Sequence, residues 1–69
     1  MTFHWEDGFR ISVAVDGGEA VVSANRAGLL SLANHLRALA EEPPGSHMHL
    51  DEHNALEKNS AELIVEIVP

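Results

Sequence analysis

The hydrophobic and polar positions near the start of the chain alternate with a period of two. In FRISVAV, residues 9–15, every second residue is apolar, and this alternation is typical of a half-buried β-strand. The sequence DGG at 16–18 tolerates positive φ and predicts a tight hairpin turn, with residues 19–24 as the returning strand. Residues 3–6 either extend the first strand or pair with it through a turn at Asp7-Gly8.

The pattern changes to a helical period between about residues 24 and 42. Leucines recur three and four positions apart and form an apolar stripe. Ser23 or Asn25 can cap the start of the helix, and the prolines at 43–44 end it. We expect the leucine stripe to pack on the strands, with Leu29, Leu32, Leu36 and Leu39 against Ile11, Val13, Leu63 and Val65.

A period of two returns after the prolines. Met48 and Leu50 alternate with polar residues, which predicts a strand at residues 47–51. Residues 53–59 are polar and typical of a turn. The run AELIVEIV, residues 61–68, is apolar on nearly both sides, as expected for a central strand of a sheet.

The predicted order is therefore strand, strand, helix, strand, strand (ββαββ). It predicts an α+β fold of two layers, a mostly antiparallel sheet of about four strands with one helix packed on one face. At 69 residues the chain predicts a single small domain, residues 1–69. It has no cysteine, so no disulfide stabilises it, and small scaffolds without one often associate. We expect a homodimer that covers the far face of the sheet, around Ile64 and Val68.

The charge of the chain narrows the classes of partner. Eleven acidic residues against four basic ones give a net charge of -7, which argues against a nucleic-acid partner. No apolar stretch approaches the ~20 residues that span a bilayer, and the N-terminus does not resemble a signal peptide. We therefore expect a soluble, cytoplasmic protein with no membrane contact. Its acidity serves either solubility or attraction of a basic protein partner.

The stretch GSHMHLDEH contains three of the five histidines and is the main candidate for chemistry. His47 and His49 are two residues apart on a strand, so their imidazoles project from one face and can share a zinc ion. Asp51 lies too far along an extended strand to join both, and Glu62 or Glu66 of a neighbouring strand would have to contribute. The simpler interpretation is a strand with surface histidines. We favour it and predict no metal and no cofactor.

Other catalytic patterns are weak. The serines lie in no nucleophile elbow, and Gly17-Gly18 lacks the spacing of a dinucleotide-binding loop. His35 lies beside Arg37 on the predicted helix, where we expect it to be solvated or to cap the helix. The sequence therefore predicts a protein that is not an enzyme.

Two segments, SANRAGLLSLANHLRALAE and PPGSHMHLDEHNALEKNSAELIVEIV, resemble bacterial immunity protein family 32. The similar features are an SANR-GL--LA helix start, an SH-HLD strand and an S-ELI terminal strand, which together cover about residues 22–67. The resemblance implies a protein that binds and neutralises a toxin made by its own cell. The acidity of the chain would suit a cationic toxin such as a nuclease. The positions that match the motif of the strand are Ser46, His47, His49, Leu50 and Asp51.

The leading hypothesis is thus a non-enzymatic, immunity-type binding protein that uses the sheet face left uncovered by the helix. Its candidate partner-binding residues are Ser46, His47, His49, Asp51 and Glu62. One alternative is a small metal-binding protein centred on His47 and His49. Another is a structural homo-oligomer without a ligand. A toxin gene beside the gene for this chain would favour the leading hypothesis.

Overall fold

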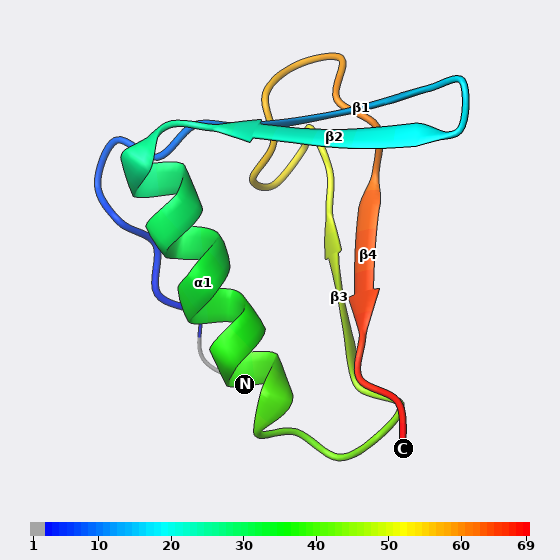
Figure 1. Ribbon diagram of the computed structural model, residues 1–69. Coiled ribbons are helices and arrows are strands. Elements are labelled where there is room, and N and C mark those ends of the chain that lie inside the picture. Colours follow the sequence, from blue (N-terminus) through cyan, green and yellow to red (C-terminus); the bar gives the residue numbers. More distant parts are fainter. Residues whose placement is uncertain (1–2) are drawn as a thin grey trace.

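The computed structural model describes residues 3–69, which form four strands and one helix (Figure 1). The α+β class and the predicted order of the elements are confirmed. None of the helices in the described residues is long and apolar enough to cross a membrane. The elements are β1 (Ile11–Asp16), β2 (Glu19–Ala24), α1 (Arg26–Ala40), β3 (His47–Leu50) and β4 (Leu63–Glu66).

The prediction of a single four-stranded sheet is wrong. Within residues 3–69 the strands form two separate antiparallel pairs, β1 with β2 and β3 with β4. The hairpin of β1 and β2 lies across one end of the other pair (Figure 1). The second edge of β1 is occupied by a loop, because the N–H groups of Glu57 and Ala61 donate to the carbonyls of Ile11 and Val13 at 2.7 and 2.8 Å. A loop on that edge leaves no place for β4 beside β1.

The hairpin itself follows the prediction. Val13 lies opposite Val22, and Gly17 and Gly18 adopt positive φ values of 57° and 84° in the tight turn. Residues 3–6 form no strand. They lead into a turn at Asp7-Gly8, which the Phe9 N–H closes by donating to the Glu6 carbonyl at 3.2 Å.

Asn25 joins three parts of the backbone at the start of α1. Its Oδ1 caps the helix by accepting from the N–H of Gly28 at 2.8 Å. The same oxygen accepts from the Arg10 N–H at 3.0 Å, and Asn25 Nδ2 donates to the Gly8 carbonyl at 2.9 Å. Of the two predicted caps, Asn25 is the one used, and it also fixes the N-terminal segment to the helix.

Gly28 allows the first turn of α1 to lie directly on β1. A Cβ atom at this position would lie 2.4 Å from the Arg10 carbonyl oxygen and 3.0 Å from a side-chain carbon of Ile11. Such a distance to backbone is not tolerated, so the helix would have to move away. The absence of a side chain here therefore sets how closely helix and hairpin approach.

The buried side of α1 is not the leucine stripe that the sequence predicted. The buried positions are Gly28, Ser31, His35 and Leu39. Leu29 and Leu36 lie about a quarter turn away around the helix and remain 56% and 49% exposed. The expected packing of the leucine stripe is therefore correct for Leu32, which packs against the core cluster. Leu39 is buried, as expected, but it is not a member of that cluster. The expected packing is wrong for Leu29 and Leu36, because the N-terminal segment packs on a different side of the helix.

The sequence suggested that His35 is solvated or caps the helix, but the structure buries it fully between α1 and the N-terminal segment. Its ring centroid lies 3.8 Å from that of Trp5 and 4.5 Å from that of Phe3, and neither ring nitrogen has a hydrogen-bond partner. Ser31, also buried, accepts from the Glu6 N–H at 2.8 Å. Burial lowers the pKa of His35 below its ordinary value of 6.5, because desolvation disfavours the charged imidazolium.

The core lies where the hairpin crosses β3 and β4. Its buried members come from β1, β3 and the loop before β4, and they are Ile11, Val13, Met48, Leu50 and Leu56. The expectation that the last strand is central is wrong: β4 pairs with β3 alone within the described residues, and Ile64 is 53% exposed. The apolar residues on one side of β4, Leu63 and Val65, pack against the core, whereas Ile64 on the other side is exposed to solvent.

We predict that Asn25→Ala destabilises the fold by about 2 kcal/mol, since it removes a helix cap and two further hydrogen bonds. The free energy of unfolding from urea titration measures the loss. Asn25→Asp is the matched control, because it keeps the accepting oxygen and loses only the bond to Gly8; it should cost less. Equal losses for the two variants would contradict the role given to the cap.

We predict that stability falls as the pH drops below 6.5, with His35 as a cause. The unfolded chain binds a proton near its ordinary pKa, whereas the folded chain resists it, so protonation favours unfolding by at most about 1.36 kcal/mol per pH unit. His35→Leu should flatten this dependence between about pH 7 and pH 5 in thermal melts. The exposed His53→Ala variant should keep the wild-type slope. Parallel profiles for His35→Leu and wild type would contradict the assignment.

Candidate partner-binding surface

The face of β3 and β4 that points away from the core carries most of the candidate residues, and we call it the outer face. Successive residues of a strand point to opposite sides, so Met48 and Leu50 turn inward while His47 and His49 turn outward. In the register of the pair, His47 lies opposite Glu66 and His49 lies opposite Ile64. The outer face, defined by His47, His49, Glu62, Ile64 and Glu66, therefore mixes imidazoles, carboxylates and one apolar side chain.

The side chains of the outer face contact one another. The rings of His47 and His49 have centroids 5.0 Å apart in an edge-on arrangement. His49 Nδ1 lies 3.5 Å from Glu62 Oε2, and each of these side chains is about half exposed. A pair this exposed contributes little to stability, so its groups remain available to a partner.

Two of the five candidate residues, Ser46 and Asp51, have structural roles instead. Ser46 precedes β3 and, by alternation, lies on the side opposite to His47; its backbone extends the pairing with β4 by accepting from the Ile67 N–H at 3.0 Å. Asp51 organises the next turn. Its Oδ1 accepts from the His53 N–H at 2.8 Å, and its carbonyl accepts from the Leu56 N–H at 2.9 Å. The structure thus brings together His47, His49 and Glu62, but not Ser46 or Asp51.

The histidines do not form the start of a metal centre in this arrangement. Among residues 3–69 no group of three or more His, Asp or Glu side chains is placed to hold a metal ion. His47 Nδ1 instead lies 3.3 Å from the carbonyl of Gly45. A structural zinc site needs four ligands in tetrahedral geometry, and the outer face offers too few at suitable distances.

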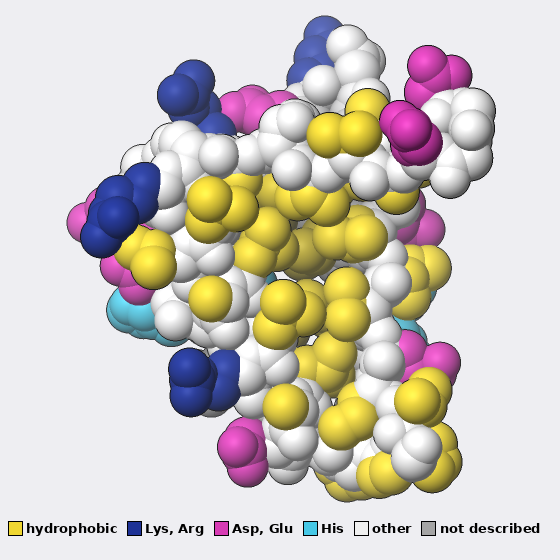
Figure 2. Space-filling view, viewed as in Figure 1, with side chains coloured by type: hydrophobic (Ala, Val, Ile, Leu, Met, Phe, Trp, Pro, Cys, Tyr) yellow, Lys and Arg dark blue, Asp and Glu magenta, His cyan; other side chains and the backbone are white. Residues whose placement is uncertain are grey.

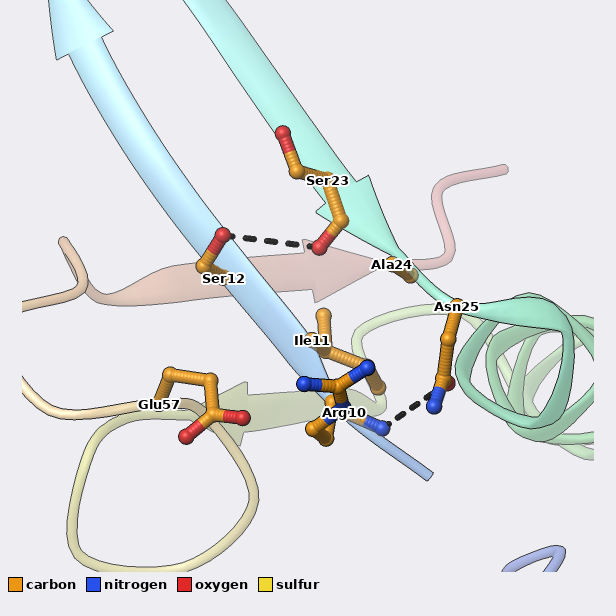
Figure 3. A pocket seen from close by; sticks show the side chains of 7 residues that line it. All are labelled: Arg10, Ile11, Ser12, Ser23, Ala24, Asn25 and Glu57. Atoms are coloured by element: carbon orange, nitrogen blue, oxygen red, sulfur yellow. Dashed lines mark hydrogen bonds between the residues drawn. The ribbon is translucent and has the colours of Figure 1, made fainter. Parts of the chain in front are cut away.

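A polar hollow of about 400 Å³ lies where the hairpin of β1 and β2 meets the start of α1 (Figure 3). Two hydrogen bonds join residues of its lining: the Arg10 N–H donates to Asn25 Oδ1 at 3.0 Å, and Ser12 Oγ donates to the Ser23 carbonyl at 3.5 Å. The Arg10 and Glu57 side chains stand at its rim with opposite charges. The hollow therefore offers no concentrated charge for a ligand.

A second hollow, which we call the apolar groove, runs between α1 and the inner side of β3 and β4 (Figure 2). It has a volume of about 410 Å³, and Val22 of β2 also lines it. Sequence reasoning missed it, because the exposed leucines were assigned to the core. The lining residues are Val22, Leu29, Leu32, Ala33, Leu36, Met48, Leu63 and Val65.

The signal that could have revealed the groove is present in the helix sequence. Leu29, Leu32 and Leu36 make one stripe, while Gly28, Ser31 and His35 make another. A helix with two such stripes has two packing partners. One packing partner is the N-terminal segment, which covers the stripe with His35. The strands are the other partner, and they cover the leucine stripe only in part.

Comparison with known proteins identifies the class. The profile of Immunity protein 32 (Imm32) matches residues 19–68, which include β2, α1, β3 and β4. This is well over half of the chain, and the chain therefore belongs to the Immunity protein 32 family. Searches of curated proteins and of solved structures found no match. The resemblance seen in the sequence is thus confirmed at the level of the family.

We predict that zinc leaves the melting temperature unchanged, since His47 and His49 lack further ligands. The measurement is a thermal melt with and without excess zinc and with a chelator. If zinc did bind, a hundredfold excess over its dissociation constant would add about 2.7 kcal/mol. A zinc-dependent rise that disappears in both His47→Ala and His49→Ala, but not in His53→Ala, would contradict this prediction.

Proposed function

We propose that this protein is a non-enzymatic immunity protein that binds a protein toxin in the cytoplasm and neutralises it. The observation that carries the proposal is the family match, which covers β2, α1, β3 and β4. Family membership implies a toxin as partner. Neutralisation by binding requires no catalytic group.

The outer face is the proposed contact surface. His47, His49, Glu62 and Glu66 supply donors and acceptors, and Ile64 adds an exposed apolar side chain between them. Non-obligate interfaces have this mixed composition and are about as apolar as the rest of a protein surface. A surface of this kind can be exposed in the free protein and still recognise a partner.

The proposed toxin is cationic. The chain carries a net charge of -7, and Glu62 and Glu66 place part of it on the outer face. Opposite charge on a partner would raise the rate of association and suppress encounters with other acidic proteins. A nuclease must approach phosphate groups and is often positively charged, so it would have the charge opposite to that of this chain.

The test uses as candidate toxin the protein encoded beside the gene for this chain, expressed in a bacterial host with and without the immunity protein. We predict that co-expression restores growth, and that the purified, catalytically inactivated toxin binds with an affinity that falls as salt is raised. His49→Ala and Glu62→Gln should each weaken binding by about tenfold, which corresponds to ~1.4 kcal/mol.

Matched controls are His4→Ala on the N-terminal segment and Glu19→Gln on β2, which lie outside the outer face. They should bind as the wild type does. Growth that is equally inhibited with and without the protein would overturn the proposed function. Tight binding that is unaffected by His49→Ala and Glu62→Gln would retain the function but move the contact surface elsewhere.

A further inference from the structure

The apolar groove is a surface that the proposed toxin contact does not use. Leu29 and Leu36 of α1 line one side of it, and Leu63 and Val65 of β4 line the other. Figure 2 shows hydrophobic side chains around this hollow. Among the residues described, none that lines the groove is charged. Leu29 and Leu36 remain about half exposed, although side chains of this type gain most from burial.

The chain as a whole exposes more surface than its mass requires. Its accessible surface is 4805 Å², whereas a compact monomer of 7.5 kDa has about 4,250 Å². The radius of gyration is 12.1 Å, against about 11 Å for a compact domain of this length. Both differences have the same sign, so the chain is less compact than a typical domain of its length.

The helix side of the groove has the spacing of a helix–helix contact. Leu29, Leu32 and Leu36 follow one another at intervals of three and four residues, and Ala33 beside them leaves room for close approach. This is the seam by which two helices pack with their side chains interlocked. A second copy of the chain would present the same seam, as a two-fold symmetric interface requires.

The distribution of charge favours a second copy over a cationic toxin as occupant. Charged side chains in Figure 2 lie around the margin of the grooved face and not within it. A basic partner would find no carboxylate in the groove, whereas two acidic chains could meet there without placing like charges together. Homodimer interfaces are also more apolar than transient ones. We infer that the apolar groove is the contact surface of a homodimer, in which each copy packs its leucine seam into the partner's groove.

The shape of the molecule suits such a contact. The Cα atoms span 31 × 30 × 19 Å, so the molecule is a flat body with two broad sides, and a standard interface takes ~800 Å² from each partner. The helix and the hairpin both extend across the face that contains the groove (Figure 1). This contact differs from the homodimer predicted from sequence, which would have covered Ile64 and Val68 on the outer side.

The test is sedimentation equilibrium of the full chain from micromolar to hundred-micromolar concentration. We expect a species of twice the 7.5 kDa chain mass. Leu36→Glu should raise the dissociation constant at least about hundredfold, because it buries a carboxylate in an apolar contact. Leu30→Glu is the matched control: Leu30 lies on the same helix, is 44% exposed and does not line the groove, so this variant should remain dimeric.

Each further outcome decides the inference. A wild-type chain that stays at 7.5 kDa throughout overturns it and leaves the groove to a different occupant, such as the toxin. Dissociation by Ile64→Glu but not by Leu36→Glu overturns it by placing the dimer on the outer face. If Leu36→Glu fails to fold, isotope-filtered NOEs in a mixed labelled and unlabelled wild-type sample replace it. Intermolecular contacts of the Leu29 and Leu36 methyls support the inference, and intermolecular contacts confined to other methyls overturn it.

Discussion

The hydrogen bonds of Asn25 determine how the rest of the molecule is arranged. One side chain caps α1 and holds the backbone at Arg10 and Gly8, so the start of the helix is fixed against the segment that leads into β1. Gly28 then allows the helix to lie against the Arg10 carbonyl. These contacts set both the position of α1 and its rotation about its own axis. With that rotation His35 faces Trp5, and the leucine stripe faces the strands across an incompletely filled space.

Two surfaces of different chemistry result. The outer face presents imidazoles and carboxylates that are solvated and only weakly paired. The apolar groove presents leucine and valine side chains without charge. A surface of the first kind can be exposed in a free protein at little cost, whereas the second loses free energy for as long as it faces water. The two proposals assign separate roles to these surfaces, recognition of a partner to the outer face and association of two copies to the groove.

Several residues in the segments that resemble the family hold the fold together. Asn25 and Gly28 belong to the helix start, and Ser60 of the terminal motif accepts from the Val13 N–H at 3.2 Å. Asp51 of the middle motif anchors the turn that places Leu56 in the core. Within that motif, His47 and His49 are the residues that point to solvent. These residues therefore support the architecture, whereas the two histidines are exposed.

The sequence by itself determined the class and order of the elements, because the periods of two and of 3.6 are local properties of the chain. It also determined the hairpin turn at Gly17-Gly18, the cap at Asn25 and the outward direction of His47 and His49. Tertiary structure alone decided which elements meet. The loop at 57–61 occupies the edge of β1 that a single sheet would need, and the N-terminal segment takes the side of α1 that carries His35. Periodicity shows that a helix has an apolar side, but it does not show which neighbour covers that side. That choice depends on contacts between residues far apart in the chain, such as those of Trp5 with His35 and of Glu57 with Ile11.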